Sequence, residues 1–536
     1  MRAFVRLLAA AALMGAAPAP EVINTPAGAV RGATERGVRV FKGVPYARPP
    51  VGPLRWRPPA ALPAWTGVRD ARAFGPACVQ PPSPPGIYHD PPRRMAEDCL
   101  HLNIWAPEDA RGLPVLVWIH GGALAGGYGH QAMYDGAALA KRGLVVVTIN
   151  YRLGPLGYLA HPGLSAESPD GVSGNYGLLD QIAALRWVRD NIRAFGGDAG
   201  NVTVAGESAG ALSVMYLMAS PAARGLFGKA VAQSAYMVST PPLKEVRFGD
   251  SAEATGLKVA AALGTKDVAA LRAMDAEALT VGAAKAGYIP WGTVDGKLLP
   301  RQLVETFDRG EQAPVALIAG FNSGEIRSLR MLAPPVPASA AAYEASIRER
   351  YGDLADAFLR LYPSRDLKEA VLAAPRDALY GWTAERLARA QTAIGQPAFL
   401  YLFDHGYPAA DEMGLHAFHA AEIPYVFGTA GRTPPFWPRI PDRLPERRLA
   451  TAMGDYWASF ARTGVPAAAG QPGWAPYGRE RAFLAFADAS RPGVRLMPGM
   501  FELHEAATCR RRAAGLPWNW NTGIASPVLL RTPECP

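Results

Sequence analysis

The first half of the chain alternates short apolar runs with segments of helical periodicity. Residues 113–119 and 144–149 are apolar, rich in β-branched side chains and bounded by glycine or polar residues, as is typical of buried strands. Residues 176–195 place apolar side chains at helical spacing, and the glycine pair that follows predicts the end of a helix. Residues 201–205 are a further predicted strand. This order predicts an α/β fold with a mostly parallel central sheet, flanked by helices.

The second half of the chain is rich in Ala, Leu and Arg at helical spacing. Helices are predicted over residues such as 367–374 and 382–392, and strands over 315–320 and 398–403. We expect these strands to extend the sheet, with long helical insertions shaping the entrance to a site. The sequence contains no internal repeat or long low-complexity linker, so residues 20–536 are predicted to form a single domain.

The first 19 residues follow a different pattern. Arg2 and Arg6 flank the start of an apolar stretch that ends at Ala17, and small residues follow. This is the arrangement of a secretory signal peptide, and the apolar stretch is too short for a membrane-spanning helix. We therefore predict export to the periplasm or the medium. The rest of the sequence has no apolar run long enough to span a bilayer.

The composition narrows the range of partners. Hydrophobic residues make up 49% of the chain and charged residues 19%, which is enough apolar material for a large core. The net charge is +9, but arginines are scattered and mixed with acidic residues, whereas nucleic-acid binding requires clustered charge with interleaved aromatics. We therefore expect no nucleic-acid partner. The alternative is that the net positive charge creates an electric field that favours capture of anionic substrates.

The chain has four cysteines, Cys78, Cys99, Cys509 and Cys535, and none is part of a C-x-x-C motif. An even number in an exported chain favours disulfides. Nearness in sequence suggests the pairs Cys78–Cys99 and Cys509–Cys535, each closing a loop of about twenty residues.

The most informative segment is the G-x-S-x-G motif of residues 206–210, which lies between a predicted strand and a predicted helix. A sharp turn in this setting raises the hydroxyl of Ser208 above the sheet, and the flanking glycines let neighbouring backbones pass closely. The amide of Ala209 would lie at a helix N-terminus, which favours negative charge. The motif predicts that Ser208 is a nucleophile; the alternative is a structural turn.

A glycine-rich loop, His120-Gly121-Gly122-Ala123, follows the predicted strand 113–119. Backbone N–H groups in such a loop can face the negative oxygen that develops during acyl transfer, forming an oxyanion hole. The alternative is an ordinary glycine-rich loop. The glycines of residues 126–129 lack the spacing of a dinucleotide-binding fingerprint.

A serine nucleophile needs a base and an acid that orients the base, in the order serine, acid, histidine for this kind of turn. Glu325 follows the predicted strand 315–320 and is one of several possible acids. Position alone does not choose the base among the histidines after Ser208, which are His405, His416, His419 and His504.

The spacing of His416, His419 and Glu422 raises the alternative of a zinc site on a helix. No further cluster of ligands in the sequence supports it, so neither a metal nor another cofactor is expected.

Five segments, spread over nearly the whole chain, match signatures of one family: residues 41–55, 97–103, 206–210, 294–296 and 419–428. On these segments the chain resembles the type-B carboxylesterases, which include bacterial p-nitrobenzyl-type esterases, lipases and cholinesterases. The resemblance implies an α/β-hydrolase fold and hydrolysis of small-molecule carboxylic esters through an acyl-enzyme on Ser208.

The resemblance also assigns roles to individual residues. It implies that His419, rather than His416, is the base and that Glu325 is the acid. The oxyanion hole would consist of the amides of Gly122, Ala123 and Ala209. Gly121, Glu207 and Ser234 would lie around these residues, and the pair Cys78–Cys99 matches an early disulfide of the family.

The chain departs from the family at several positions. Ala123 stands where many members have glycine, and its methyl group would narrow the acyl side of the site. Gly324 precedes Glu325 where a second acidic residue is common. The loop between Cys78 and Cys99 contains no Trp, which argues against choline esters as substrates.

Three alternatives stay open. The chain could be a catalytically inactive, cholinesterase-like binding protein, or an amidase or thioesterase with the same triad. Arg327 and Arg330, just after the acid, could bind carboxylates of polycarboxylate esters of the fumonisin kind. The sequence leaves open whether the protein is a monomer or a homodimer.

Overall fold

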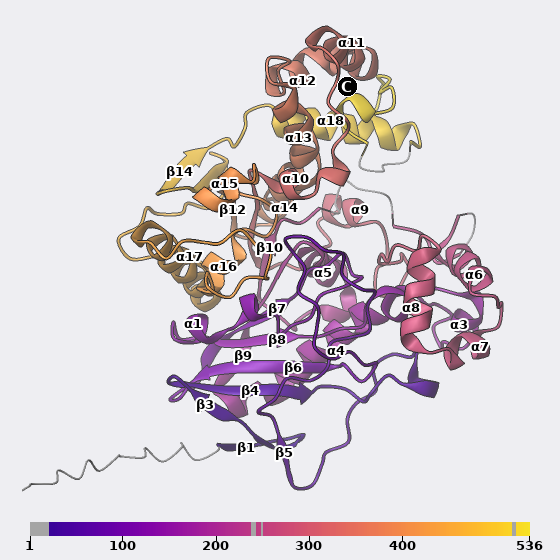
Figure 1. Ribbon diagram of the computed structural model, residues 1–536, viewed down its shortest axis with the longest axis vertical. Helices are drawn as coiled ribbons and strands as arrows, with labels where there is room; N and C mark the ends of the chain where they lie inside the picture. Colours follow the sequence, from indigo (N-terminus) through magenta and orange to yellow (C-terminus); the bar gives the residue numbers. More distant parts are fainter. Residues whose placement is uncertain (1–20, 237–242, 248–249, 517–520, 536) are drawn as a thin grey trace, which may run out of the picture.

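A mixed sheet of eleven strands forms the centre of the protein, as seen in a computed structural model (Figure 1). The structure describes residues 21–236, 243–247, 250–516 and 521–535, so the expected signal peptide lies outside the described residues. Both disulfides, Cys78–Cys99 and Cys509–Cys535, are present.

Seven neighbouring strands of the large sheet run parallel, and antiparallel strands lie at both edges. The parallel strands are, in order across the sheet, β8 (Val145–Ile149), β7 (Leu113–Ile119), β9 (Gly197–Glu207), β10 (Lys229–Gln233), β11 (Ala316–Asn322), β12 (Ala398–Phe403) and β13 (Ala482–Phe486). The antiparallel strands are β3 (Ala33–Glu35), β4 (Val38–Pro45) and β6 (His101–Pro107) at one edge and β14 (Ser490–Val494) at the other. A separate small sheet contains β1 (Val22–Thr25), β2 (Gly28–Arg31) and β5 (Val68–Asp70).

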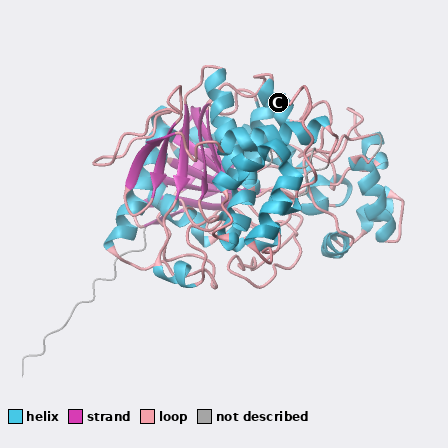
Figure 2. Cartoon of the chain, turned by 90° about the horizontal axis from the view of Figure 1, so that it is seen from above, coloured by secondary structure: helices cyan, strands magenta, loops and turns pink. Residues whose placement is uncertain are grey.

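Strand β7 illustrates how the sequence pattern builds the core. Every side chain of its interior is buried, and successive side chains point to opposite faces of the sheet. Val115 and Val117 belong to the core cluster on one face, whereas Leu116 and Trp118 belong to the cluster on the other. Burial on both faces explains why this strand is continuously apolar. The mostly parallel sheet with its flanking helices confirms the α/β fold class predicted from the sequence. Figure 2 shows the pronounced twist of the strands.

Helices flank the sheet and form two outlying groups (Figure 1). Helices α3 and α6–α8 gather at one end, and α11–α13 with α18 gather at another, each group around a core cluster of its own. The helices are α1 (Ala137–Ala140), α2 (Gly154–Tyr158), α3 (Pro162–Ala166), α4 (Tyr176–Asn191), α5 (Ala209–Ala219), α6 (Ala252–Ala262), α7 (Val268–Ala273), α8 (Ala276–Lys285), α9 (Leu303–Asp308), α10 (Glu325–Ser328), α11 (Ala340–Tyr351), α12 (Ala355–Leu361), α13 (Leu367–Arg376), α14 (Trp382–Ala393), α15 (Pro408–Glu412), α16 (Ile423–Phe427), α17 (Leu444–Thr463) and α18 (Met500–Ala513). Among the described residues, no helix combines the length and apolar character that crossing a bilayer requires.

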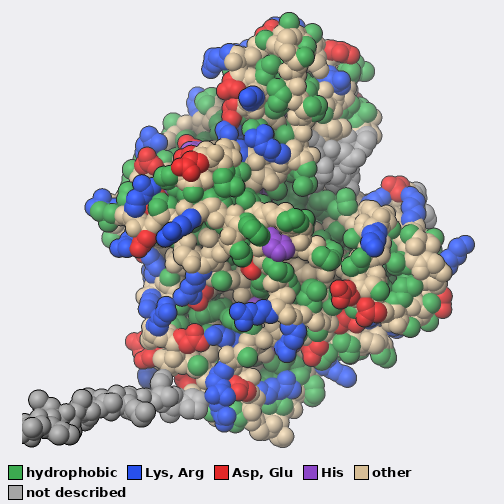
Figure 3. All heavy atoms as spheres, viewed as in Figure 1, with side chains coloured by type: hydrophobic (Ala, Val, Ile, Leu, Met, Phe, Trp, Pro, Cys, Tyr) green, Lys and Arg blue, Asp and Glu red, His purple; other side chains and the backbone are tan. Residues whose placement is uncertain are grey.

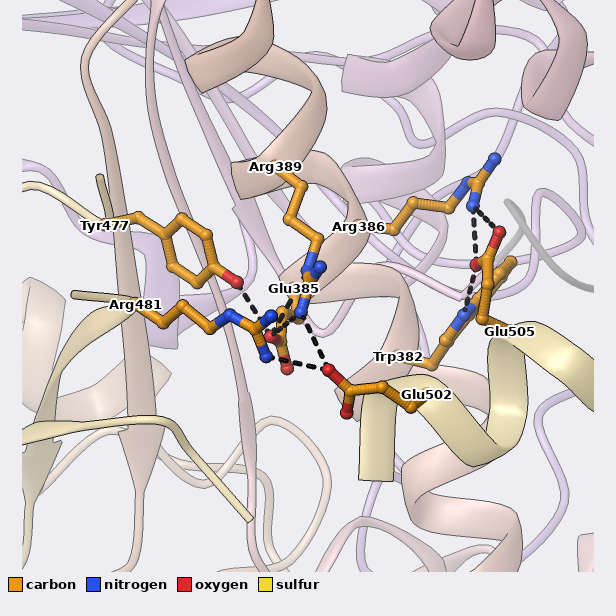
Figure 4. A network of polar contacts seen from close by, with 8 residues as sticks. All are labelled: Trp382, Glu385, Arg386, Arg389, Tyr477, Arg481, Glu502 and Glu505. Atoms are coloured by element: carbon orange, nitrogen blue, oxygen red, sulfur yellow. Dashed lines mark hydrogen bonds and ion pairs between the residues drawn. The ribbon is translucent and has the colours of Figure 1, made fainter. Parts of the chain in front are cut away.

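A network of charged and aromatic side chains attaches α18 to α14 (Figure 4). Glu502 of α18 accepts a 2.7 Å hydrogen bond from Arg481 and lies 3.5 Å from Arg389 of α14. One turn further along α18, Glu505 accepts hydrogen bonds from Trp382 and Arg386. The Cys509–Cys535 disulfide then ties the end of the chain to the same helix.

On the face shown in Figure 3, Lys and Arg side chains alternate with Asp and Glu rather than forming one basic patch. On this face, positive and negative side chains are therefore interspersed.

Candidate active site

The predicted site residues follow strands whose carboxyl ends meet at one edge of the sheet. Gly121 follows β7, Ser208 follows β9, and Ser234 follows the neighbouring β10. Glu325 follows β11, and His419 lies in the connection after β12. Ligand and active sites of open α/β sheets lie outside the carboxyl ends of the strands, so the topology alone brings these segments together.

Ser208 occupies a strained turn between β9 and α5. Its backbone has φ 56° and ψ −122°, in the positive-φ range that side-chain-bearing residues rarely adopt. A Cβ atom on Gly206 would lie 2.5 Å from the carbonyl of Gly210, and one on Gly210 would collide with the carbonyl oxygen of Ile119. The turn therefore packs so closely against β7 that only glycine fits on either side of it.

The glycine-rich loop after β7 packs directly against this turn. A Cβ atom on Gly121 would lie 3.2 Å from Cβ of Ser208. Gly122 and Ala123 both have positive φ, of 105° and 55°, so the loop turns sharply beside the serine. The buried Ala209 begins helix α5 on the other side. The three segments with the expected oxyanion-hole amides are therefore neighbours of Ser208.

Glu325 and His419 are joined by a short hydrogen bond. The distance between Glu325 Oε2 and His419 Nδ1 is 2.5 Å, and the carboxylate is fully buried. The other oxygen, Oε1, accepts a 2.8 Å hydrogen bond from the backbone N–H of Asn322. On its far side, Nε2 of His419 lies 3.1 Å from Oε1 of Glu207, the residue before Ser208.

The imidazole of His419 therefore lies between Glu325 and Glu207, the residue before Ser208. In the described part of the chain, no hydrogen bond joins the hydroxyl of Ser208 to His419, so that bond stays a prediction.

Comparison with known proteins identifies the family. Residues 19–494 match the carboxylesterase family. The chain belongs to the carboxylesterase family. It is 39% identical over 482 residues to the fumonisin B1 esterase of Sphingopyxis macrogoltabida, covering 87% of this chain and 86% of that protein. It is 37% identical over 462 residues to the para-nitrobenzyl esterase of Bacillus subtilis, covering 83% of this chain and 90% of that protein.

Solved structures agree with this assignment. A Geobacillus stearothermophilus carboxylesterase superimposes with a TM-score of 0.78 at 35% identity, covering 90% of this chain and 99% of that one. A structure of PNB esterase superimposes with a TM-score of 0.77 at 32% identity, with the same coverage. The protein is thus a carboxylic ester hydrolase with the fold of these enzymes, as the sequence signatures predict.

Three buried carboxylates set the electrostatics of the carboxylesterase site. Burial, the largest effect, raises the pKa of Glu207 to about 8; the nearby charge of His419 opposes this, while Glu422 and Glu325 add to it. Burial also raises the pKa of Glu422, which accepts hydrogen bonds from Gln233 and Asn322.

Burial and the neighbouring carboxylates act on the pKa of His419 in opposite directions. Burial alone would lower the pKa of its imidazole, but the charges of Glu207 and Glu325 and the hydrogen bond to Glu325 outweigh burial and raise the pKa to about 9. Carboxylates therefore favour the imidazolium, which is the form that follows proton transfer from a serine.

Replacing Glu207 by Gln is expected to shift the pH dependence of catalysis. A base works only when it is neutral, and removing the negative charge beside Nε2 lowers the pKa of His419. The lower limb of the kcat/KM profile should move by about one pH unit towards acidic pH. Profiles of wild type and Glu207→Gln on one neutral ester check this; an unchanged midpoint would show that Glu207 does not act on the base.

The other histidines after Ser208 have partners elsewhere. His405 Nε2 lies 2.7 Å from Glu446, and His504 Nε2 lies 2.8 Å from the hydroxyl of Tyr362. His416 contacts two aspartates rather than Glu325. Among these four histidines in the described residues, His419 is the one with a hydrogen bond to Glu325.

The segment that raised the zinc alternative is not a helix. Residues 416–419 form a loop, so the spacing of His416, His419 and Glu422 does not place them on one helical face. His416 and Glu422 face different partners, and among the described residues no group of three potential metal ligands is found.

Several site residues had no signal in the sequence. The hydroxyl of Tyr88 donates to the backbone oxygen of His419 over 2.8 Å, and Ser328 accepts a bond from the backbone N–H of His419 over 3.3 Å. Gln80 exchanges two hydrogen bonds with the backbone of Gly127 and thereby braces the glycine-rich loop. These contacts join segments far apart in sequence, so no local motif could reveal them.

Ser234 lies close to the turn that contains Ser208. Its neighbour Gln233 accepts a 3.0 Å hydrogen bond from the backbone N–H of Ser208, and Ser234 itself has φ 52° and donates its backbone N–H to Gly320. The backbone on which Ser234 lies is thus hydrogen-bonded, through Gln233, to the turn that contains Ser208.

The two arginines that follow Glu325 differ in their surroundings. Arg327 is paired with Glu369 at 2.6 Å, so its charge is already compensated. Arg330 is exposed at the start of the short 3-10 helix Arg330–Leu332. Of the two, Arg330 is the more exposed, whereas Arg327 is half-buried.

Proposed function

We propose that this carboxylesterase cleaves esters in two steps through an acyl-enzyme on Ser208. His419 takes the proton of the Ser208 hydroxyl, and the oxygen bonds to the ester carbonyl carbon. The amides of Gly122, Ala123 and Ala209 hold the resulting oxyanion, a contribution of about 10²–10³ in rate per donor. The imidazolium then gives its proton to the leaving alcohol as the ester C–O bond breaks.

In the second step His419 removes a proton from water as the water oxygen bonds to the acyl carbon. The bond from this carbon to the Ser208 oxygen then breaks, the imidazolium returns the proton to that oxygen, and the carboxylic acid leaves. Glu325 holds the imidazole so that Nδ1 carries a proton and Nε2 is free to accept one. The observation that supports the proposal is the placement of His419 between Glu325 and Glu207, the residue before Ser208.

A fluorophosphonate probe tests the assignment of the nucleophile. The probe should form one covalent adduct, which peptide mass spectrometry should place on Ser208, because only a serine activated by a base attacks phosphorus at neutral pH. An adduct on another residue, or no adduct on folded protein, would contradict the proposal.

We also propose that the protein is exported, with residues 1–19 as the signal peptide. Two disulfides support this location, because such bonds persist in oxidising compartments and are rare in the cytosol.

For the substrate, we propose esters that carry further carboxylate groups. The similarity to a protein named fumonisin B1 esterase and the exposed Arg330 support this class. Replacing Arg330 by Ala should lower the ratio of kcat/KM on a dicarboxylate ester to that on a neutral ester about fivefold, since one charge contact is lost. An unchanged ratio would remove Arg330 from substrate recognition. Arg327→Ala is the comparison, because Glu369 already pairs with Arg327.

A further inference from the structure

His416, three residues before His419, is held between two aspartates. Its Nδ1 lies 3.0 Å from Oδ1 of Asp411, and its Nε2 lies 3.2 Å from Oδ1 of Asp404. A neutral imidazole carries a single N–H, so both hydrogen bonds exist together only when His416 is an imidazolium. The hydrogen bond to Asp404, the largest effect, raises the pKa of His416 above its ordinary value; burial opposes this, and Asp411 adds to it.

Asp404 connects this histidine to the loop of the proposed acid. The same oxygen, Oδ1, accepts a 2.5 Å hydrogen bond from the hydroxyl of Ser323, two residues before Glu325. The backbone oxygen of Ser323 in turn accepts a 3.0 Å bond from Arg376 of α13. The charged groups around His416 are therefore Asp404 and Asp411 in direct contact, with Arg376 acting on Asp404.

The two loops also meet through their backbones. The N–H of Gly324 donates to the carbonyl oxygen of Ala417 over 2.8 Å. The side-chain amide of Asn322 donates to the backbone carbonyl oxygen of Phe418, also over 2.8 Å. A Cβ atom on Gly324 would lie only 2.7 Å from the carbonyl oxygen of Leu415. Glycine at this position therefore permits an approach that a second acidic residue would prevent.

The backbone of His416 is strained, with φ 50°, a conformation that glycine adopts far more readily. A side chain persists in such a conformation where surrounding contacts hold it. Here the side chain bridges Asp404 and Asp411.

We propose that His416 is a positioning residue whose imidazolium clamps the loop of Glu325 to the loop of His419 and so sets the geometry of the Glu325–His419 hydrogen bond. This inference rests on the catalytic roles proposed above for Glu325 and His419. It assigns a function to the histidine that the family resemblance leaves aside.

The test replaces His416 by Gly, which suits φ 50° and so removes the clamp without adding backbone strain. At pH 7, kcat on a neutral ester should fall about tenfold with KM within about twofold, because misplaced catalytic groups slow the chemical step. The ratio of wild-type to variant kcat should shrink as the pH rises through the raised pKa of His416, because the wild type then loses its own clamp. A ratio within about twofold at all pH values, or a large ratio that does not vary with pH, would overturn the proposal.

Two further variants make the result specific. Ser323→Ala should also lower kcat. The double variant Ser323→Ala/His416→Gly should be no slower than His416→Gly alone, because both changes break the same chain of contacts. If the losses of kcat in the two single variants instead add fully in the double variant, the clamp is contradicted. Asp442→Asn, in an exposed ion pair with Arg447 on the surface, is the matched control for loss of an aspartate contact.

Failure of the His416 clamp can be distinguished from failure of the proposed mechanism. If Ser208→Ala is inactive while His416→Gly behaves as wild type, the clamp alone is refuted. If Ser208→Ala keeps full activity, the proposed mechanism itself fails.

Discussion

Replacing Ser208 by Ala is expected to lower kcat by about 10⁶-fold. The change removes the oxygen that forms the acyl-enzyme but leaves the Glu325–His419 hydrogen bond in place. Ala tolerates φ 56° no better than Ser, so the strain of the turn is the same in both proteins. The remaining rate would come from substrate binding and the oxyanion-hole amides.

The measurement is kcat on a p-nitrophenyl ester, with circular dichroism and thermal unfolding to verify the fold. Ser83, an exposed serine, provides the matched control variant Ser83→Ala. Removing a catalytic serine lowers kcat by far more than a hundredfold. Turnover by Ser208→Ala above about 1% of wild type would therefore require another nucleophile.

The central elements could be predicted because their signals are local. The continuous apolar run of β7 reflects burial on both faces, and the sequence prediction of 113–119 coincides with the strand. The helix predicted over 176–195 is found as α4 followed by a 3-10 turn, and it ends where Gly196 takes φ 86°. Edge strands were not predicted, and β14 shows why: it is short and mostly exposed, and it contains Pro492.

The candidate site was predictable only in part. Ser208 lies in a motif whose glycines are dictated by backbone contact, so a local pattern identifies it. Glu325 and His419 are 94 positions apart, and spacing alone left several acids and histidines open. The family resemblance chose between them. The bridge from His416 to Asp404 and Ser323 depends on three loops meeting, and no sequence pattern encodes it.

Replacing Glu325 by Gln is expected to lower kcat by about 10⁴-fold while preserving the fold. Both oxygens of Glu325 accept hydrogen bonds, Oε1 from the backbone N–H of Asn322 and Oε2 from His419. Gln offers one acceptor and one NH₂ group, and the buried N–H of Asn322 requires the acceptor. The NH₂ group then faces Nδ1 of His419, which must give up its proton.

The proton of the imidazole consequently moves to Nε2, and a protonated Nε2 cannot accept the proton of Ser208. Loss of the Glu325 charge also removes one cause of the raised pKa of His419, so the lower limb of the kcat profile should shift towards acidic pH. Glu422→Gln is the matched control, because Glu422 is equally buried and accepts two hydrogen bonds, from Gln233 and Asn322 rather than from His419. It should lower kcat less than about tenfold. Equal losses of kcat in the two variants would show that the buried carboxylates of the cluster are equally important for catalysis. A loss of kcat confined to Glu325→Gln would instead identify the tautomer of His419 as the property that Glu325 controls.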